Sequence, residues 1–301
     1  MSTQKVGYVA IVGRPNVGKS TLLNAMLGQK ISITSKKRQT TRHNIVGIKT
    51  AEQYQMVFVD TPGMHQGQDS AINRYMNRTA SSALQDVDLV VFVVDKNHWT
   101  GEDEAVALKL TSSNIPIIIA LNKCDQLDTL DRLLPHVGAL AKKLQGAEIV
   151  PVSALKRERL ELLEQLILEK LPVSEHLIYP EDQLTDRNMR FIAAEIVREK
   201  VIRLSGAELP YQSTVEIEKY DEAADLVTIH ALILTEREGQ KRILIGERGE
   251  RIKQIGIDAR QDLERLLDCK VMLRIWVKVK SGWSDDERAI RSLGFDESSP
   301  R

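Results

Sequence analysis

The stretch Gly13-Arg-Pro-Asn-Val-Gly-Lys-Ser20 fits the pattern GxxxxGK[ST] and stands between an apolar run at residues 6–12 and a helical pattern at residues 21–27. Its two glycines allow backbone N–H groups to curl around phosphate oxygens at the start of a helix. In this pattern the lysine reaches the β and γ phosphates, and the serine hydroxyl ligates Mg²⁺. We therefore predict a phosphate-binding loop with contacts from Gly13, Arg14, Pro15, Asn16, Val17, Gly18, Lys19, Ser20 and Thr21.

Short β-branched runs alternate with helical patterns through the first half of the chain. Residues 6–12, 55–60, 89–95, 117–121 and 148–152 read as strands, and another strand begins at Ile45. This alternation predicts an α/β fold, a P-loop NTPase G domain whose mostly parallel sheet is flanked by helices, over residues 1–172. Residues 173–186 are polar and contain Pro180, which suits a linker.

Two further motifs end predicted strands of this domain. Asp60-Thr-Pro-Gly63 places a carboxylate where it can hold Mg²⁺ through water, and the Gly63 N–H can sense a γ phosphate. Asn122-Lys-Cys-Asp125 supplies a carboxylate that accepts hydrogen bonds from N1–H and N2–H of guanine, a pair of donors that adenine lacks. Asp125 therefore makes guanine the expected base, with Asn122 bracing the loop and Lys123 covering the ring.

Ser153-Ala154 follows the last predicted strand and can offer a backbone N–H to guanine O6. Four motifs in this order predict a site for GTP or GDP with Mg²⁺. We expect Mg²⁺ to be held by Ser20, Thr41 and Asp60. The remaining predicted nucleotide contacts are Thr61, Pro62, Gly63, Asn122, Lys123, Asp125, Ser153 and Ala154.

The polar loop at residues 29–44 carries three adjacent cations, Lys36, Lys37 and Arg38. Such a loop suits a switch that is ordered only when the γ phosphate and Mg²⁺ are present. We expect Thr41 to fasten it, with Thr40 as the alternative. Many GTPases place a glutamine after the DxxG glycine to orient the attacking water. This chain has Met64 there, so intrinsic hydrolysis is expected to be slow.

The second half has a different order of elements. Its pattern is a helix at residues 187–204, strands at 212–219 and 226–235, a short helix before Gly246, a helix at 250–267 and a strand at 271–280. This αββααβ order is that of an α+β type II KH domain, which we place at residues 187–301 with a C-terminal tail. We find neither an internal repeat nor a second phosphate loop.

The segment Ile245-Gly-Glu-Arg-Gly249 contains GxxG, which can also be a plain turn between helices. In KH domains the glycines let a sugar-phosphate backbone approach closely, and a groove, here Ile243, Ile245, Ile252 and Ile255, holds about four nucleotides. Residues 237–280 carry 12 Lys and Arg against 7 Asp and Glu, although the whole chain is neutral. We expect RNA contacts from Lys241, Arg242, Ile245, Gly246, Glu247, Arg248, Gly249, Arg251 and Lys253.

No aromatic residue flanks this turn, so a stacking platform is not expected there. Trp276 and Trp283, near the last predicted strand, are expected in the core or at a partner contact rather than stacked on RNA.

Composition sets the remaining limits. The chain has 301 residues, of which 42% are hydrophobic, which indicates a folded protein of about two domains. No apolar run approaches the ~18 residues of a membrane-spanning helix, and the N-terminus lacks a secretory signal, so we expect a cytoplasmic location. Cys124 and Cys269 are far apart and lack metal-ligand spacing, so we expect two free thiols.

The whole chain resembles the Era GTPase family. The resemblance rests on GRPNVGKS, QTTRH at residues 39–43, DTPG, NKCD and VSA at residues 152–154, and on the KH pattern that follows. GAELP at residues 206–210, VKVKSGW at 277–283 and DDER at 285–288 add to it. Cys124 departs from the family, in which a small aliphatic residue is usual.

This resemblance implies binding near the 3′ end of 16S ribosomal RNA, a role in assembly of the 30S ribosomal subunit, and partial peripheral association with the inner face of the cell membrane. It favours Thr41, which precedes Arg42 as in related GTPases. In related K⁺-stimulated GTPases an asparagine at the place of Asn16 helps to seat K⁺, so K⁺ stimulation is a hypothesis. We assign catalytic roles to Asn16, Lys19, Thr41 and Gly63, and expect a monomer.

Two other interpretations stay open at this point. An RNA-binding scaffold or checkpoint protein could use GTP only as a structural ligand, and Met64 supports this alternative. A membrane-linked signalling GTPase would need a lipid-binding element, but the sequence has no long cationic amphipathic helix.

Overall fold

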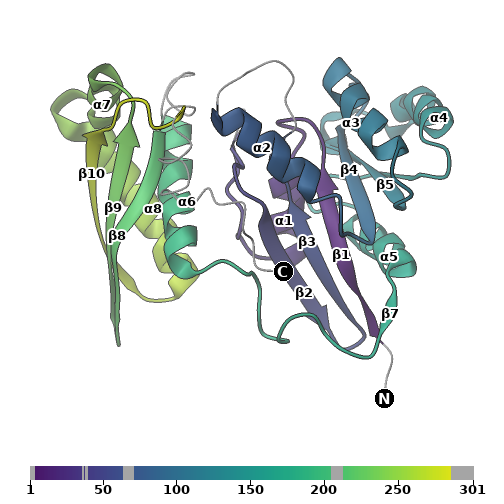
Figure 1. Cartoon of the computed structure of the whole chain (residues 1–301), viewed down its shortest axis with the longest axis horizontal. Coiled ribbons are helices and arrows are strands. Elements are labelled where there is room, and N and C mark those ends of the chain that lie inside the picture. The colour runs from purple at the N-terminus through teal and green to yellow at the C-terminus, as the bar shows by residue number, and fades with distance from the viewer. Residues whose placement is uncertain (1–3, 36, 38–39, 64–70, 205–212, 286–301) are drawn as a thin grey trace. The chain divides into compact units, whose positions relative to one another are not determined.

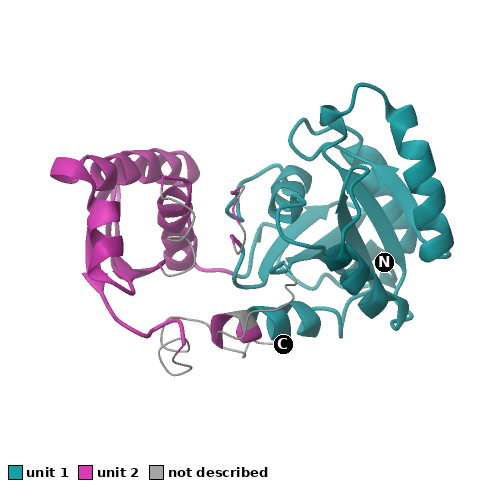
Figure 2. Ribbon diagram, turned by 90° about the horizontal axis from the view of Figure 1, so that it is seen from above, with its two compact units in different colours: residues 1–34, 41–68, 76–186 teal, residues 35–40, 69–75, 187–301 magenta. Residues whose placement is uncertain are grey.

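The computed structural model describes residues 4–35, 37, 40–63, 71–204 and 213–285 (Figure 1). The chain forms two compact units, shown in different colours in Figure 2. The first comprises residues 1–34, 41–68 and 76–186, and the second comprises residues 35–40, 69–75 and 187–301.

The first unit contains a seven-stranded sheet in the order β2-β3-β1-β4-β5-β6, with β7 paired to β1. Only β2 and β7 run antiparallel to their neighbours. Because β1, β4 and β5 are buried between layers of helices, they are almost wholly apolar. The strands are β1 Gln4–Val12, β2 Ile45–Ala51, β3 Tyr54–Asp60, β4 Leu89–Asp95, β5 Ile117–Asn122, β6 Glu148–Pro151 and β7 Val173–Ser174.

Helices α1 to α5 connect these strands, so the predicted α/β G-domain fold is confirmed. Their bounds are α1 Lys19–Leu27, α2 Ala71–Ser82, α3 Gly101–Thr111, α4 Leu134–Lys143 and α5 Leu160–Lys170, with short 3-10 turns at Cys124–Gln126 and Leu130–Leu133. The parallel strands β1, β3, β4 and β5 have their carboxyl ends at one edge of the sheet. That edge therefore brings together the loops that follow Val12, Asp60, Asp95 and Asn122.

The segment at residues 173–186 lies along the first unit. The buried side chain of Gln55 accepts hydrogen bonds from the amides of Ile178 and Tyr179, both at 2.9 Å. Farther along, the amide of Ile48 donates to the carbonyl of Leu184 at 2.8 Å. The segment thus supplies partners to the edge strand β2, whose outer backbone groups would otherwise be unpaired. The division into residues 1–172, 173–186 and 187–301 stays a prediction.

The second unit has the element order α6, β8, β9, α7, α8, β10, so the predicted αββααβ pattern is confirmed. Its sheet order is β10-β9-β8, and α6 and α8 pack on one face around Val197, Ile233 and Leu263. The bounds are α6 Met189–Leu204, β8 Ser213–Ala223, β9 Leu226–Thr235, α7 Glu238–Ile245, α8 Glu250–Leu267 and β10 Lys270–Val279.

The two tryptophans near the end of this unit differ in burial. Trp283 is 1% exposed, so its predicted core position is confirmed. Trp276 is 42% exposed and lies outside the core. Both cysteines are free thiols, as predicted, and Cys124 is buried.

Candidate functional site

The phosphate-binding loop joins the end of β1 to the start of α1. Gly18 has φ +101°, a conformation that L side chains rarely adopt, and a Cβ there would lie 2.3 Å from Nδ2 of Asn122. Glycine is therefore required at this position. The buried Nζ of Lys19 donates to the carbonyls of Gly13 and Arg14, both at 3.0 Å. The ammonium group thus lies inside the loop, where phosphate oxygens bind in this motif.

Burial lowers the pKa of Lys19 to about 8, although the nearby Asp60 carboxylate acts in the opposite direction. A bound phosphate favours the charged ammonium and so raises this pKa. Below about pH 8 the lysine is charged with or without nucleotide, whereas above it the free protein must take up a proton on binding. We expect GTP affinity to fall by up to about tenfold per pH unit above pH 8.

Calorimetry at pH 8.5 in two buffers of different ionisation enthalpy measures this proton uptake directly. The half-buried Lys96, whose Nζ contacts Gln126, provides a control, because a Lys96→Ala variant should keep the uptake. Equal binding heats in the two buffers would contradict the role assigned to Lys19.

Four side chains converge beside Lys19. Oδ2 of the fully buried Asp60 accepts hydrogen bonds from the hydroxyls of Ser20 at 2.6 Å and Ser32 at 2.9 Å. The hydroxyls of Ser20 and Thr41 are 2.8 Å apart. Burial raises the pKa of Asp60, and the hydrogen bond from Ser20 and the charge of Lys19 oppose that shift. The hydroxyl of Thr40 donates instead to the carbonyl of Lys37 at 2.7 Å.

This cluster fits Mg²⁺. The second carboxylate oxygen of Asp60, Oδ1, is buried and has no hydrogen-bond partner. A buried carboxylate oxygen left open beside two hydroxyls matches the oxygen ligands that Mg²⁺ prefers, often through water. Thr41, not Thr40, lies in this cluster.

The loops after β5 and β6 are joined by side-chain hydrogen bonds. Asn122 donates from Nδ2 to the Val17 carbonyl at 2.8 Å, and its Oδ1 accepts from the Ala154 amide at 3.0 Å. The hydroxyl of the buried Ser153 donates to Oδ1 of Asp125 at 2.6 Å. The Asp125 carboxylate is therefore oriented before any base binds. The Ala154 N–H, which we expected to face guanine O6, is engaged here by Asn122.

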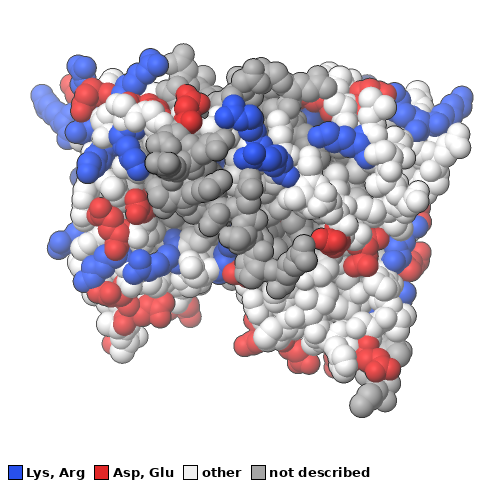
Figure 3. All heavy atoms as spheres, in the orientation of Figure 1, with Lys and Arg blue, Asp and Glu red and all other residues white. Residues whose placement is uncertain are grey.

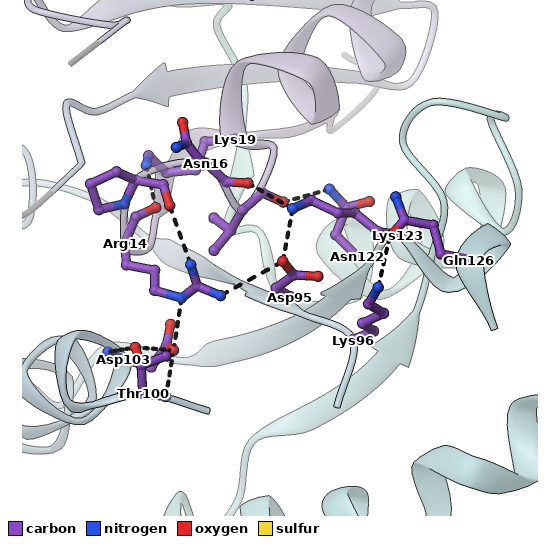
Figure 4. Close-up of polar contacts among 12 residues, drawn as sticks. Arg14, Asn16, Lys19, Asp95, Lys96, Thr100, Asp103, Asn122, Lys123 and Gln126 are labelled. Carbon is purple, nitrogen blue, oxygen red and sulfur yellow. Dashed lines mark hydrogen bonds and ion pairs between the residues drawn. The ribbon is translucent and has the colours of Figure 1, made fainter. Parts of the chain in front are cut away.

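Two residues predicted to contact the nucleotide also have protein partners (Figure 4). The Arg14 guanidinium donates from Nε to Asp103 at 2.9 Å and lies 3.7 Å from Asp95. Nζ of Lys123 donates to the carbonyl of Asn16 and to the same Asp95 oxygen, both at 2.8 Å. Asp95 thus connects the phosphate loop to the base-recognition loop, and Arg14 anchors the phosphate loop to the start of α3.

The DTPG motif follows β3 at the same edge of the sheet. The buried Thr61 hydroxyl donates to the Ile11 carbonyl at 2.9 Å, and Pro62 is buried beside it. Gly63 lies directly against Pro15 of the phosphate loop. Met64, the basis of the expected slow hydrolysis, lies outside the described residues, as do Lys36 and Arg38 of the basic loop.

Three residues of the site were missed in the sequence. Asp95 ends a strand at the same edge of the sheet as Asp60 and Asn122, and this position could have identified it as a residue of the site. Asp103 stands three residues after Thr100 in a capping box at the start of α3, a local pattern that explains its burial but not its contact with Arg14. No local pattern pointed to Ser32, because its contact with Asp60 spans 28 residues.

The GxxG turn lies between α7 and α8 of the second unit. Gly246, Arg248 and Gly249 all have positive φ, at +73°, +49° and +80°. Arg242, Arg248 and Lys253 are exposed around the turn, as is Glu247. Arg251 is half-buried and donates to the Ile243 carbonyl, so it holds the end of α7. Lys241 lies 4.0 Å from Glu238 on the same helix.

The apolar groove predicted beside this turn needs one correction. Ile255 is 0% exposed and belongs to the core cluster, so it cannot contact a base. Ile243 is 47% exposed, and Ile245 and Ile252 are half-buried. The error arises because Ile255 lies one turn farther along α8 than Ile252, on the side that faces the sheet.

Among the described helices, none is long and apolar enough to cross a membrane.

Two known protein families match separate parts of the chain. The family model for 50S ribosome-binding GTPases matches residues 8–123, and the model for the KH domain matches residues 208–284.

Curated relatives match over nearly the whole length. GTPase Era of Ectopseudomonas mendocina is 62% identical over 97% of each chain. GTPase Era of Azotobacter vinelandii is 60% identical over 98% of each chain.

Two solved structures resemble the chain closely. A single-residue variant of Aquifex aeolicus Era bound to GDP·AlF4⁻ has a TM-score of 0.94 and 39% identity, covering 97% of this chain and 99% of that one. An Era complex with MgGDPNP and nucleotides 1506–1542 of 16S ribosomal RNA has a TM-score of 0.93, with the same identity and coverage.

Proposed function

The chain belongs to the Era GTPase family, and on this premise we propose that it is a GTP-dependent switch that binds 16S ribosomal RNA near its 3′ end during assembly of the 30S subunit. The protein is a GTPase that binds guanine nucleotide with Mg²⁺ and carries a KH domain. One observation supports the proposal most: a GxxG turn with exposed cations occurs in the same chain as a guanine-nucleotide site.

The choice of the small subunit follows from the RNA. The family model that matches the G domain is named for GTPases that bind the 50S ribosome. That model covers only residues 8–123 of this chain. An Era relative that aligns with both units of this chain has been solved in complex with 16S ribosomal RNA, and this RNA is a component of the 30S subunit. The choice of ribosomal subunit therefore rests on the RNA in that relative's complex and not on the G-domain family model.

In this proposal each group of the nucleotide site has a separate task. Asp125, oriented by Ser153, accepts hydrogen bonds from guanine, and Lys19 neutralises phosphate oxygens. Ser20, Thr41 and Asp60 would hold Mg²⁺, which supplies charge neutralisation at the phosphates. Because Thr41 belongs to the loop at residues 29–44, loss of the γ phosphate would release that loop.

The role as a switch predicts that RNA stimulates hydrolysis. We expect single-turnover GTP hydrolysis to be slow without RNA and at least about tenfold faster with an RNA of the 16S 3′ tail, because binding would order the loops around the γ phosphate. Rapid-quench assays with the tail and with a scrambled RNA of equal length measure this. No stimulation by the tail would favour the alternative, an RNA-binding scaffold with GTP as a structural ligand.

Stimulation by K⁺ is part of the proposal. The side chain of Asn16 is exposed beside the phosphate loop, and its backbone carbonyl is held by Lys123. A cation seated there would offset charge that develops on the phosphates. We expect turnover about tenfold faster in KCl than in NaCl, and an Asn16→Ala variant that does not distinguish the two salts. Equal rates for the unaltered protein would remove K⁺ from the mechanism.

Three further parts of the proposal concern location and oligomeric state. They are a cytoplasmic location, partial peripheral association with the inner face of the cell membrane, and a monomeric state. Fractionation of cells that express a tagged chain tests the first two, and sedimentation of the purified protein tests the third.

A further inference from the structure

In the sheet of the second unit, α6 and α8 cover one face, and the other face exposes a row of side chains along β10. On β10, Leu273, Ile275 and Val277 pack against the core cluster. The residues between them and at both ends are exposed, and we call this set the β10 face: Lys270, Met272, Arg274, Trp276, Lys278 and Lys280.

Charge on the exposed face of this sheet differs between its two edges. Four of the six residues of the β10 face are cations, and neither β9 nor β10 contains Asp or Glu. In the described part of the chain none of the four forms an ion pair. The acidic residues gather on β8, at the other edge of the sheet, where Asp221 is paired with Lys219 at 2.6 Å.

Figure 3 shows Lys and Arg side chains along the left margin with Asp and Glu side chains between them, and Asp and Glu gather toward the lower end. At the strand rise of about 3.3 Å per residue, the row from Lys270 to Lys280 extends over about 33 Å.

The centre of the β10 face is aromatic. The Trp276 ring is 42% exposed and packs against His230 of β9, with ring centroids 5.3 Å apart and an interplanar angle of 50°. Leu232, the register partner of Trp276 on the parallel strand β9, lies on the same face and is 8% exposed. An exposed indole between cations offers a flat surface on which an unpaired base can stack.

We propose that the β10 face is a second RNA-contact surface, which holds single-stranded RNA through phosphate contacts to its cations and stacking of a base on Trp276. This inference rests on the proposed RNA-binding function. A KH groove holds about four nucleotides, so RNA that continues past the groove needs another contact surface. The face exposes two apolar side chains, which is too few for insertion into a lipid surface, and its unpaired cations complement a polyanion.

The first test uses Trp276→Ala and Trp276→Phe with two RNAs. A four-nucleotide oligomer fills only the groove, and a longer single-stranded RNA runs past it. We expect Trp276→Ala to weaken binding of the longer RNA by about tenfold or more, without changing binding of the short oligomer. Trp276→Phe should restore most of the affinity, because phenylalanine keeps a ring for stacking.

The second test removes charge without removing an aromatic ring. An Arg274→Ala/Lys278→Ala variant should bind the longer RNA less tightly and reduce the slope of log affinity against log salt by about 1.4. The matched control is Arg260→Ala/Arg265→Ala, which removes two exposed cations of α8 and should leave the slope unchanged. Thermal melts verify that all variants fold.

The outcomes separate this inference from the proposed function. If both β10 variants bind the longer RNA as tightly as the unaltered chain, while a Gly246→Asp variant does not bind it, the inference is wrong and the proposed function stands. If the unaltered chain fails to bind either RNA, the proposed function itself fails. If the β10 variants lose binding to phosphatidylserine vesicles but keep RNA binding, the face contacts lipid and the inference is wrong.

Discussion

An Asp125→Asn variant is expected to bind GTP about 100-fold or more weakly than the unaltered protein and to gain affinity for XTP. Each hydrogen bond to a charged group contributes about 1.5–3 kcal/mol, and the carboxylate can accept two from guanine. The amide of asparagine can accept one of them and can donate to O2 of xanthine instead. The oxygen that accepts from the Ser153 hydroxyl at 2.6 Å is retained, so the side chain keeps its orientation.

Titration of fluorescent GTP and XTP analogues measures this change in base preference. Asp128→Asn is the matched control, because Asp128 lies in the same loop but is exposed and paired with Arg132. That variant should keep the preference for guanine. Unchanged GTP selectivity in Asp125→Asn would contradict the assignment of Asp125 to base recognition.

A Gly246→Asp variant is expected to lose RNA binding by about 100-fold or more, which corresponds to the loss of two charge-assisted contacts of about 1.5 kcal/mol each. Gly246 has φ +73°, and a Cβ there would lie 2.8 Å from Cβ of Arg251. The new side chain strains the turn and also places a negative charge where a phosphate must approach. GTP binding should be unaffected, because the nucleotide site is in the other unit.

Filter binding with the 16S 3′ tail measures this effect. Gly239→Asp introduces the same charge into α7 at a position where a Cβ meets no atom within 4 Å, and it should leave RNA binding nearly intact. An Arg248→Ala/Lys253→Ala variant tests the turn without backbone strain, since both side chains are exposed. Full RNA binding by both turn variants would show that the GxxG turn is not the contact.

Short contiguous motifs predicted much of this site from the sequence alone. GxxxxGK[ST] encodes a glycine turn followed by a helix, and the structure has Gly18 at φ +101° directly before α1. The αββααβ order of the second unit was also predicted from the sequence. Hydrophobic periodicity and the residues that begin and end helices are local properties. In both cases the physical requirement lies within a few consecutive residues.

Contacts between distant residues required the folded sheet. Arg14 meets Asp103 across 89 positions, and Ser32 meets Asp60 across 28, since the strands carry them to the same edge. Folding likewise brings residues 178–179 to the Gln55 side chain, and packing of α8 on the sheet of the second unit buries Ile255.

Trp276 shows most clearly which property the sequence pattern does not specify. Its neighbours in the chain alternate between apolar and charged residues, which identifies a strand but not which of its faces is covered. Packing of α6 and α8 on one side of the sheet left the tryptophan exposed beside His230, a residue 46 positions away. Burial depends on which elements pack together, and strand alternation contains no information about that.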